Sequence, residues 1–397
     1  MPDVPAFPME RDCPFDPPPE LSRIRAECPV SRVRLWDGSH PWLVTGYDDQ
    51  RAVLADRRFS ADVTRPGYPH VTAASAARRR RSRTFISMDE PEHGMYRKML
   101  TGTFMIKRVE ALRPRIQRIV DDLIDAMLAG APPADLVTDF ALPVPSLVIC
   151  ELLGVPYADH DFFQRCSRTI VSTRSTAQDA TAAADELKDY LSRLLERKTA
   201  EPADDLLSKL VVEQSGTLTR SQIADMALLL LVAGHETTAN MIGLGTLTLL
   251  QHPDQLAELR ATEDPKLVAG AVEELLRYLN IVHSGRRRVA MEDVEVGGRL
   301  IRAGEGVIVT TDSGNRDANA FPDPDVLDIH RQARHHVAFG YGVHQCLGQP
   351  LARVELQVVY GTLYRRVPTL RLAVPLEKIR FKHDMLVYGV HELPVSW

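Results

Sequence analysis

One cysteine near the end of the chain stands in a setting suited to chemistry. Cys346 follows the glycine-punctuated segment that begins at Phe339, and an apolar helical pattern starts at about Pro350. A helix start offers unpaired N–H groups and the positive end of the helix dipole, so we expect a lowered pKa for the thiol. The thiolate can bind a metal or act as a nucleophile, and an inert buried cysteine is the remaining alternative.

A second polar cluster, residues 233–238, interrupts a long apolar stretch with the sequence Ala-Gly-His-Glu-Thr-Thr. Gly234 lowers helix stability by about 1 kcal/mol and gives room for something to approach the backbone. A threonine hydroxyl can also bond the carbonyl one turn back and bend the helix. The cluster indicates a ligand pocket with a proton relay, or else a buried Glu236 that is paired with a structural basic residue.

The second cluster lies near the centre of a predicted helix over roughly residues 220–251. Thr219 and Gln222 form a possible capping box at its start, and Pro253 lies just beyond its end. At about 1.5 Å per residue, the helix is about 45 Å long, which is comparable to the diameter of a domain. Its surface is apolar nearly all round, so we expect it to cross the interior.

The remaining patterns predict a mainly α protein with small β-sheets, in the α+β class. Apolar residues at three- and four-residue spacing predict successive helices from about residue 90 to 280. Short alternating runs at residues 294–296 and 306–311 predict strands, which we expect to cluster in the last third. No repeat, linker or change of composition follows the proline-rich segment 1–20, so we expect a single domain over residues 1–397.

The composition excludes disordered and collagen-like classes and makes several partners improbable. Of the 397 residues, 44% are hydrophobic and 25% are charged, and the formal net charge is −5. This charge gives no reason to expect binding to nucleic acid or to an anionic membrane. The N-terminus lacks an apolar run, so we expect no membrane anchor and a cytoplasmic location. The five cysteines are scattered without a C-x-x-C pair, which favours a role for a single cysteine.

The spacing F-x-x-G-x-x-x-C-x-G, carried by Phe339, Gly342, Cys346 and Gly348, resembles the haem-binding signature of the cytochrome P-450 superfamily. Residues 233–238 resemble the oxygen-activation motif of that family. The segment from Asn315 to Gln349 resembles its soluble actinobacterial branch. The resemblance implies the cytochrome P-450 fold as a single large domain. Haem b (iron protoporphyrin IX) would lie between the long central helix and the cysteine loop, with Cys346 as axial ligand of the iron.

The resemblance also implies roles for basic residues. His93 and Arg97 resemble the H-x-x-x-R pattern that holds haem propionates, and Arg288 and His344 match later propionate-binding positions. The full set of residues implied to contact the cofactor is His93, Arg97, Ala233, Gly234, Arg288, Phe339, Gly340, His344, Cys346 and Gly348.

Glu274 and Arg277 resemble the E-x-x-R helix of the family, which implies a buried structural lock. An exposed salt bridge between residues three apart is the alternative, and it would contribute only tenths of a kcal/mol.

The implied reaction is the insertion of one oxygen atom from O2 into a C–H bond of a bulky lipophilic molecule. A cysteine ligand favours O–O cleavage over reversible oxygen carriage. Thr237 is implied to hydrogen-bond the oxygen being reduced, and Glu236 to bring protons in, while Ala233 and Gly234 leave space beside the iron. The chain lacks a G-x-G-x-x-G motif and an iron–sulfur cysteine cluster, so we expect a separate ferredoxin and ferredoxin reductase as electron donors. We also expect the protein to be a monomer.

Several alternatives remain open at this stage. The same fold could catalyse epoxidation, demethylation or oxidative coupling. Two alternatives from other functional classes are a haem-binding sensor and a hydrolase with Cys346 as nucleophile. The substrate is expected to be a natural product, such as a macrolide or another polyketide, or a xenobiotic. The basic run from Arg78 to Arg83 is either a solvated loop or part of a lid that meets an acidic group on the substrate.

Overall fold

The computed structural model describes residues 4–79 and 84–397. Residues 80–83 and the side chains of Arg78 and Arg79 lie outside the described structure, and with them the proposed role of the basic run. The chain divides into two compact units, one formed by Met1–Arg97 with Ala269–Gln349 and the other by Lys98–Val268 with Pro350–Trp397. A single domain over residues 1–397 stays a prediction.

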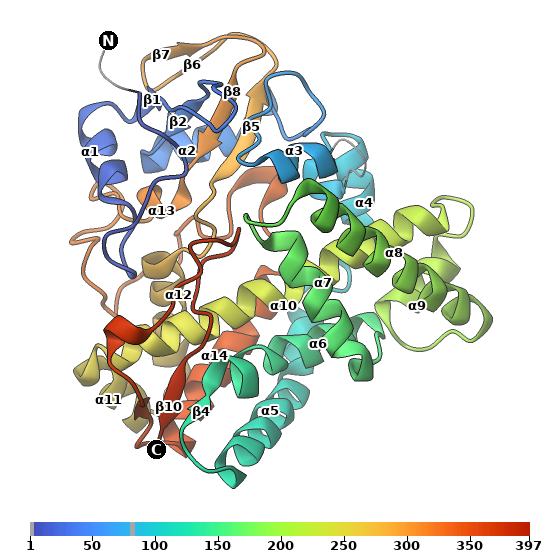
Figure 1. The fold of residues 1–397 in the computed structure, drawn as a ribbon, viewed down its shortest axis with the longest axis vertical. Coiled ribbons are helices and arrows are strands. Elements are labelled where there is room, and N and C mark those ends of the chain that lie inside the picture. The colour runs from blue at the N-terminus through green and yellow to red at the C-terminus, as the bar shows by residue number, and fades with distance from the viewer. Residues whose placement is uncertain (1–3, 80–83) are drawn as a thin grey trace. The chain divides into compact units, whose positions relative to one another are not determined.

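The first unit is built around a five-stranded sheet with the strand order β1-β2-β8-β5-β3 (Figure 1). Strand β2 runs parallel to β8, and the other neighbours are antiparallel. The strands are β1 (Val30–Arg32), β2 (Trp42–Val44), β3 (Phe59–Ser60), β5 (Arg286–Ala290) and β8 (Gly306–Val309), with a separate hairpin of β6 (Val294–Val296) and β7 (Arg299–Ile301).

The predicted strands at residues 294–296 and 306–311 are confirmed as β6 and β8, although β8 ends at Val309. Six of the ten strands found in the described residues lie in the last third, as predicted, whereas β1, β2 and β3 precede residue 61. These strands have only two or three residues, too few to show an alternating pattern. They form through tertiary pairing, in which Val44 and Val309 share one buried core with Leu54.

Helices complete the first unit and form most of the second. The first unit contains α1 (Pro19–Glu27), α2 (Tyr47–Ala55), α3 (Ala73–Arg79) and α13 (Thr311–Gly314). The chain passes from one unit to the other within α4 (Glu92–Thr101), α12 (Pro265–Leu279) and α14 (Gln349–Arg366). The second unit contains α5 (Ile106–Ala129), α6 (Pro143–Leu153), α7 (His160–Val171), α8 (Ala177–Ala200), α9 (Leu206–Glu213), α10 (Arg220–Leu250) and α11 (Pro253–Ala261). It also holds a three-stranded sheet of β4 (Ala134–Asp135), β9 (Arg371–Leu372) and β10 (Pro394–Ser396).

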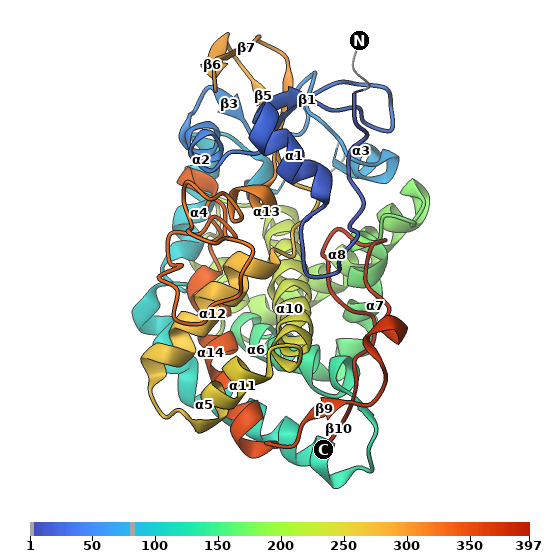
Figure 2. The same ribbon diagram turned by 90° about the vertical axis from the view of Figure 1, so that its left-hand side faces the viewer.

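Helix α10 is the centre of the second unit and confirms the predicted long helix. Thr219 and Gln222 form the expected capping box, and the helix packs against α6 and α8 (Figure 2). Among the described helices, only α10 is long and apolar enough to cross a membrane, and 72% of its most apolar window is buried inside the structure. Burial on nearly all sides explains its continuous apolar surface.

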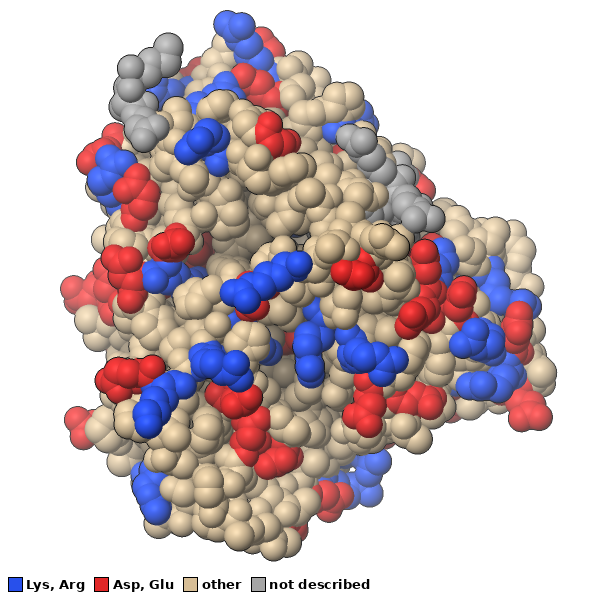
Figure 3. Space-filling model, viewed as in Figure 1, with Lys and Arg blue, Asp and Glu red and all other residues tan. Residues whose placement is uncertain are grey.

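Charged side chains of both signs are interspersed over the face shown in Figure 3. This mixture agrees with the small net charge of −5. Charge on this face is therefore balanced locally rather than gathered into a field of one sign.

Candidate active site

The cysteine loop has a backbone that depends on glycine. Gly340 and Gly342 have φ values of +76° and +71°, which are unfavourable for other residues. A Cβ atom at Gly342 would also lie 2.4 Å from the carbonyl oxygen of Leu54. The amide of Cys346 donates to the carbonyl of Phe339 at 2.9 Å, which closes the loop shortly before α14 begins. The predicted loop-to-helix setting of Cys346 is thus observed.

The predicted lowering of the Cys346 pKa is wrong for the polypeptide by itself. The side chain is accessible at its surface, yet protein surrounds it closely enough that burial raises the pKa of the thiol. The amides of Gly348 and Gln349 and the guanidinium groups of Arg286 and Arg97 act in the opposite direction but do not prevail. A coordinated metal deprotonates a thiol outright, so the thiolate would come from ligation rather than from the helix start.

Two histidines and two arginines form a cluster in the same unit as Cys346, in which His93 and Arg288 are buried and His344 and Arg97 are partly buried. The rings of His93 and His344 have centroids 4.1 Å apart, and His93 Nδ1 donates to a carboxylate oxygen of Glu90 at 3.1 Å. Burial, and to a smaller extent the nearby charges of Arg288, His93 and Arg97, together lower the pKa of His344 to about 3. The positive charges around His344 disfavour its protonated form and would favour a bound anion.

The cluster fits the carboxylates of haem. Among the described residues, His93 Nε2 and His344 Nδ1 are buried side-chain nitrogens that have no hydrogen-bond partner. Buried polar atoms normally have a partner, and the two propionates of iron protoporphyrin would supply acceptors for them. Arg97 additionally donates to the carbonyl of Gln345 at 2.7 Å, so the same residue ties α4 to the cysteine loop.

Arg286 is a residue of this region that the sequence reasoning missed. It donates to the carbonyl of Ala338 at 2.6 Å and to Thr311 Oγ1 at 2.7 Å, and its side chain packs against Gly340. Alternation along β5 places Arg286 and Arg288 on one face of the strand and Arg287 on the other. This period of two was the signal that could have found Arg286.

Glu274 and Arg277 form a bidentate ion pair with two bonds of 2.7 Å, and both side chains are fully buried. Arg277 also donates to the carbonyls of Asn315 and Pro324 at 2.8 and 2.7 Å. Arg331 adds a third charge, with its Nε 3.1 Å from Glu274. The pair therefore differs from the exposed salt bridge that was the alternative, and it joins α12 to the segment that follows α13.

Residues 233–238, which resemble an oxygen-activation motif, lie at the middle of α10 in the second unit. Thr237 donates its hydroxyl to the carbonyl of Ala233 at 2.8 Å, and the hydroxyl oxygen keeps lone pairs that can accept a hydrogen bond. The space expected beside Gly234 is filled by protein, because a Cβ atom there would lie 2.7 Å from Ile149 of α6. Gly234 therefore permits close packing of α6 on α10.

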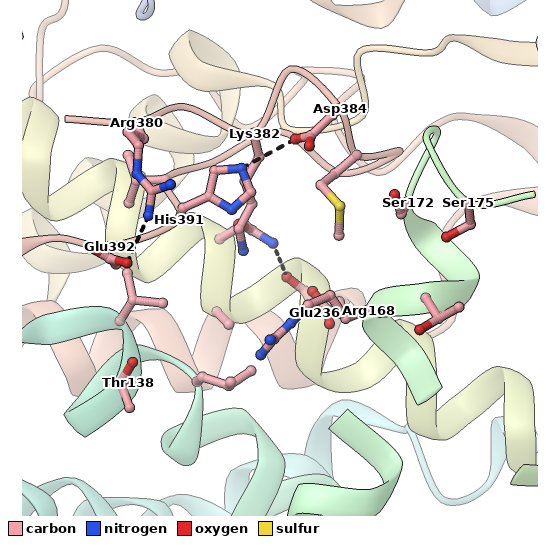
Figure 4. A pocket seen from close by; sticks show the side chains of 17 residues that line it. Thr138, Arg168, Ser172, Ser175, Glu236, Arg380, Lys382, Asp384, His391 and Glu392 are labelled. Carbon is pink, nitrogen blue, oxygen red and sulfur yellow. Dashed lines mark hydrogen bonds and ion pairs between the residues drawn. The ribbon is translucent and has the colours of Figure 1, made fainter. Parts of the chain in front are cut away.

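Glu236 is 7% exposed and lines a cavity of about 550 Å³ within the second unit (Figure 4). Asn240 donates to the backbone carbonyl of Glu236 at 2.7 Å and accepts from Lys382 Nζ at 2.9 Å. Burial lowers the pKa of Lys382, while the charge of Glu236 raises it. A lysine that interacts electrostatically with Glu236 is thus present together with a cavity, so the relay and the charge-paired glutamate are compatible interpretations of this motif.

Comparisons with known proteins agree with this arrangement. The family model described as Cytochrome P450 matches residues 25–367. Cytochrome P450-SU2 of Streptomyces griseolus is 58% identical over all of this chain and 98% of its own length. Pentalenic acid synthase of Streptomyces avermitilis is 54% identical over 99% of this chain and 97% of its own length. The crystal structure of the mycinamicin VIII C21 methyl hydroxylase MycCI from Micromonospora griseorubida, bound to mycinamicin VIII, matches with a TM-score of 0.94 and 43% identity. That match covers 99% of this chain and 100% of that one. The chain therefore belongs to the cytochrome P450 family.

Proposed function

We propose that Cys346 is the axial ligand of haem b in this monooxygenase, and that His93, Arg97, Arg288 and His344 hold the haem propionates. The observation that carries this proposal is the histidine and arginine cluster with two unpartnered ring nitrogens. Bound haem supplies the reduction of O2 and the insertion of one oxygen atom into a C–H bond, with water as the other product.

The haem assignment is tested with Cys346→Ser and His344→Phe. Cys346→Ser is expected to abolish the thiolate-type Soret band of the reduced carbon monoxide complex. His344→Phe is expected to keep that band and to bind haem more weakly, because a charge-assisted bond is lost. Haem content and the spectrum of each purified variant measure this. A thiolate-type spectrum in Cys346→Ser would overturn the assignment of the ligand.

We infer further that Glu236 and Thr237 form the proton relay. The support is that Glu236 lines a polar cavity and that Thr237 offers a hydroxyl next to it on α10. Thr237→Ala is expected to uncouple the reaction, so that electrons are consumed with little product, because the hydroxyl no longer helps to deliver protons. Product formed per NAD(P)H consumed measures the coupling. Thr237→Ser should retain most of it, and full coupling in Thr237→Ala would contradict the relay.

The proposed substrate is a bulky lipophilic natural product, and the proposed reaction is hydroxylation. Support comes from the relatives, since one is named pentalenic acid synthase and another is a methyl hydroxylase with mycinamicin VIII bound. A screen for compounds that shift the haem spin state, followed by product analysis, tests both parts. Products of epoxidation, demethylation or coupling would replace hydroxylation in this assignment.

The proposed partners are a separate ferredoxin and ferredoxin reductase, and the proposed state is a cytoplasmic monomer. The charge of −5 and the interspersed surface charges support a protein that needs neither nucleic acid nor a membrane surface. Sedimentation of the haem-loaded protein measures the oligomeric state.

A further inference from the structure

His235 lies beside Glu236 on α10 and has no role in the function proposed above. Its side chain is fully buried, and its ring packs edge-on against Phe163 of α7. His235 Nδ1 lies 2.7 Å from the carbonyl oxygen of Leu231. A carbonyl oxygen can only accept, so Nδ1 carries the hydrogen and the tautomer is defined.

The second ring nitrogen, Nε2, is a bare acceptor in this tautomer. Burial lowers the pKa of His235, which keeps the ring neutral. Nε2 is buried without a hydrogen-bond partner among the described residues, and the nearest carboxylate oxygen, Glu236 Oε1, is 3.7 Å away. Two acceptors at that distance repel each other weakly, and they become donor and acceptor if the carboxyl group gains a proton.

Lys382 lies near Glu236, and its positive charge attracts the carboxylate. Lys382 is fixed there through Asn240, and the cavity of Figure 4 opens toward solvent, since Arg380 and Glu392 on its rim are 70% and 58% exposed. Other titratable or charged groups that face this region are Arg168 from α7, Asp135 from β4, and Asp384 and His391 from the C-terminal segment.

We propose that His235 is a positioning residue that holds the protonated form of Glu236, while Lys382 holds the ionised form. This inference rests on the proposed relay function of Glu236. A hydronium ion in the cavity breaks one O–H bond to become water, and the proton forms an O–H bond on the carboxylate. The carboxylic acid then turns by a small rotation and donates a hydrogen bond to His235 Nε2. When the proton leaves for the reaction, the carboxylate returns to the side of Lys382.

Infrared difference spectroscopy on the haem-loaded protein tests this proposal directly. The carbonyl stretch of protonated Glu236 is identified by its absence in Glu236→Gln and by its shift in D2O. His235→Phe is expected to move this band to the higher frequency of a free acid. It should also reduce the band's amplitude at fixed pH by roughly 2- to 10-fold, the range that one hydrogen bond contributes. His235→Gln restores an acceptor and should recover the band, whereas Lys382→Met should increase its amplitude.

His252 supplies a matched control, because its Nδ1 makes the same backward bond, to the carbonyl of Thr248 at 2.8 Å. His252→Phe should leave the Glu236 band unchanged. The proposal is overturned if His235→Phe leaves the band of the wild-type protein unaltered, or if that protein shows no protonated band at any pH at which it is folded.

Turnover separates this proposal from the relay on which it rests. If Glu236→Gln leaves the coupling of electrons to product intact, the relay fails, and the infrared band alone decides the contact with His235. If Glu236→Gln uncouples turnover but His235→Phe does not, the relay stands and the role of His235 is overturned. The expected result is a severalfold loss of coupling in His235→Phe that His235→Gln recovers.

Discussion

Glu355 on α14 is a buried residue whose protonation state is controlled by burial. Its carboxyl group is fully enclosed, and burial raises its pKa from 4.5 to about 8, while a hydrogen bond with Thr238 acts in the opposite direction. Between these two values, the folded protein holds a proton that the unfolded chain releases. The contribution of Glu355 to stability is therefore lost progressively as the pH rises from about 4.5 to about 8.

Glu355→Gln is expected to remove this dependence, because the amide is neutral at every pH. The variant should differ little from the parent protein at pH values near 4.5 and be more stable near pH 8.5. Each unit of difference between the pKa values of the folded and unfolded states changes the free energy of unfolding by about 1.4 kcal/mol. Urea unfolding at both pH values measures this. Glu213→Gln, on an exposed position of α9, is the control. An unchanged pH slope in Glu355→Gln would show that the carboxyl group is ionised in the folded state.

The attachment of α12 depends on the buried pair of Glu274 and Arg277. Arg277→Ala leaves a buried carboxylate and backbone carbonyls without their donor, so we expect a loss of about 3–5 kcal/mol in the free energy of unfolding. Arg113→Ala breaks an ion pair of the same spacing, with Glu110, that is largely exposed, and should cost less than about 1 kcal/mol. Denaturant titration compares the two. Similar losses in both variants would mean that burial of the Glu274–Arg277 pair does not increase its contribution to the free energy of unfolding.

The packing of α6 on α10 can be tested at Gly234. Alanine favours a helix over glycine by about 1 kcal/mol, but the clash with Ile149 should cost about 1–3 kcal/mol. Gly234→Ala is therefore expected to destabilise the native protein and to stabilise the Ile149→Ala variant. A double-mutant cycle by thermal unfolding measures this reversal. Gly361→Ala on α14 is the control, since its Cβ would make only an ordinary contact of 3.5 Å with Val268. Additive effects at Gly234 and Ile149 would contradict the packing role.

The whole molecule is expected to depend on external electron donors. Residues 25–367 match the cytochrome P450 family, and a separate ferredoxin with its reductase is the electron source proposed above. NAD(P)H alone should therefore give no product, whereas added ferredoxin and ferredoxin reductase should support turnover. Product formation and NAD(P)H consumption with each component omitted measure this. Product from the purified chain and NADPH alone would show an internal route for electrons.

Local patterns in the sequence were sufficient for the long helix, for the cysteine loop and for the family. The capping box at Thr219, the apolar run of α10 and the glycines around Cys346 act over a few residues, so spacing alone reveals them. The resemblance to the family added further candidate residues, namely His93, Arg97, His344 and the E-x-x-R pair. The positions of the short strands β1 to β3 could not be read from the sequence, because their stability comes from partners that are distant in the chain.

Only the tertiary structure decided how these residues are surrounded. The helix start by itself would lower the pKa of the Cys346 thiol, but burial raises it. Ile149 fills the space beside Gly234. The fold also brings the charge of Lys382 near Glu236 and places His235 Nε2 3.7 Å from the Glu236 carboxylate, and the sequence indicated neither arrangement. Desolvation and long-range contacts depend on what the folded chain packs around a group, and that information is absent from the spacing of a motif.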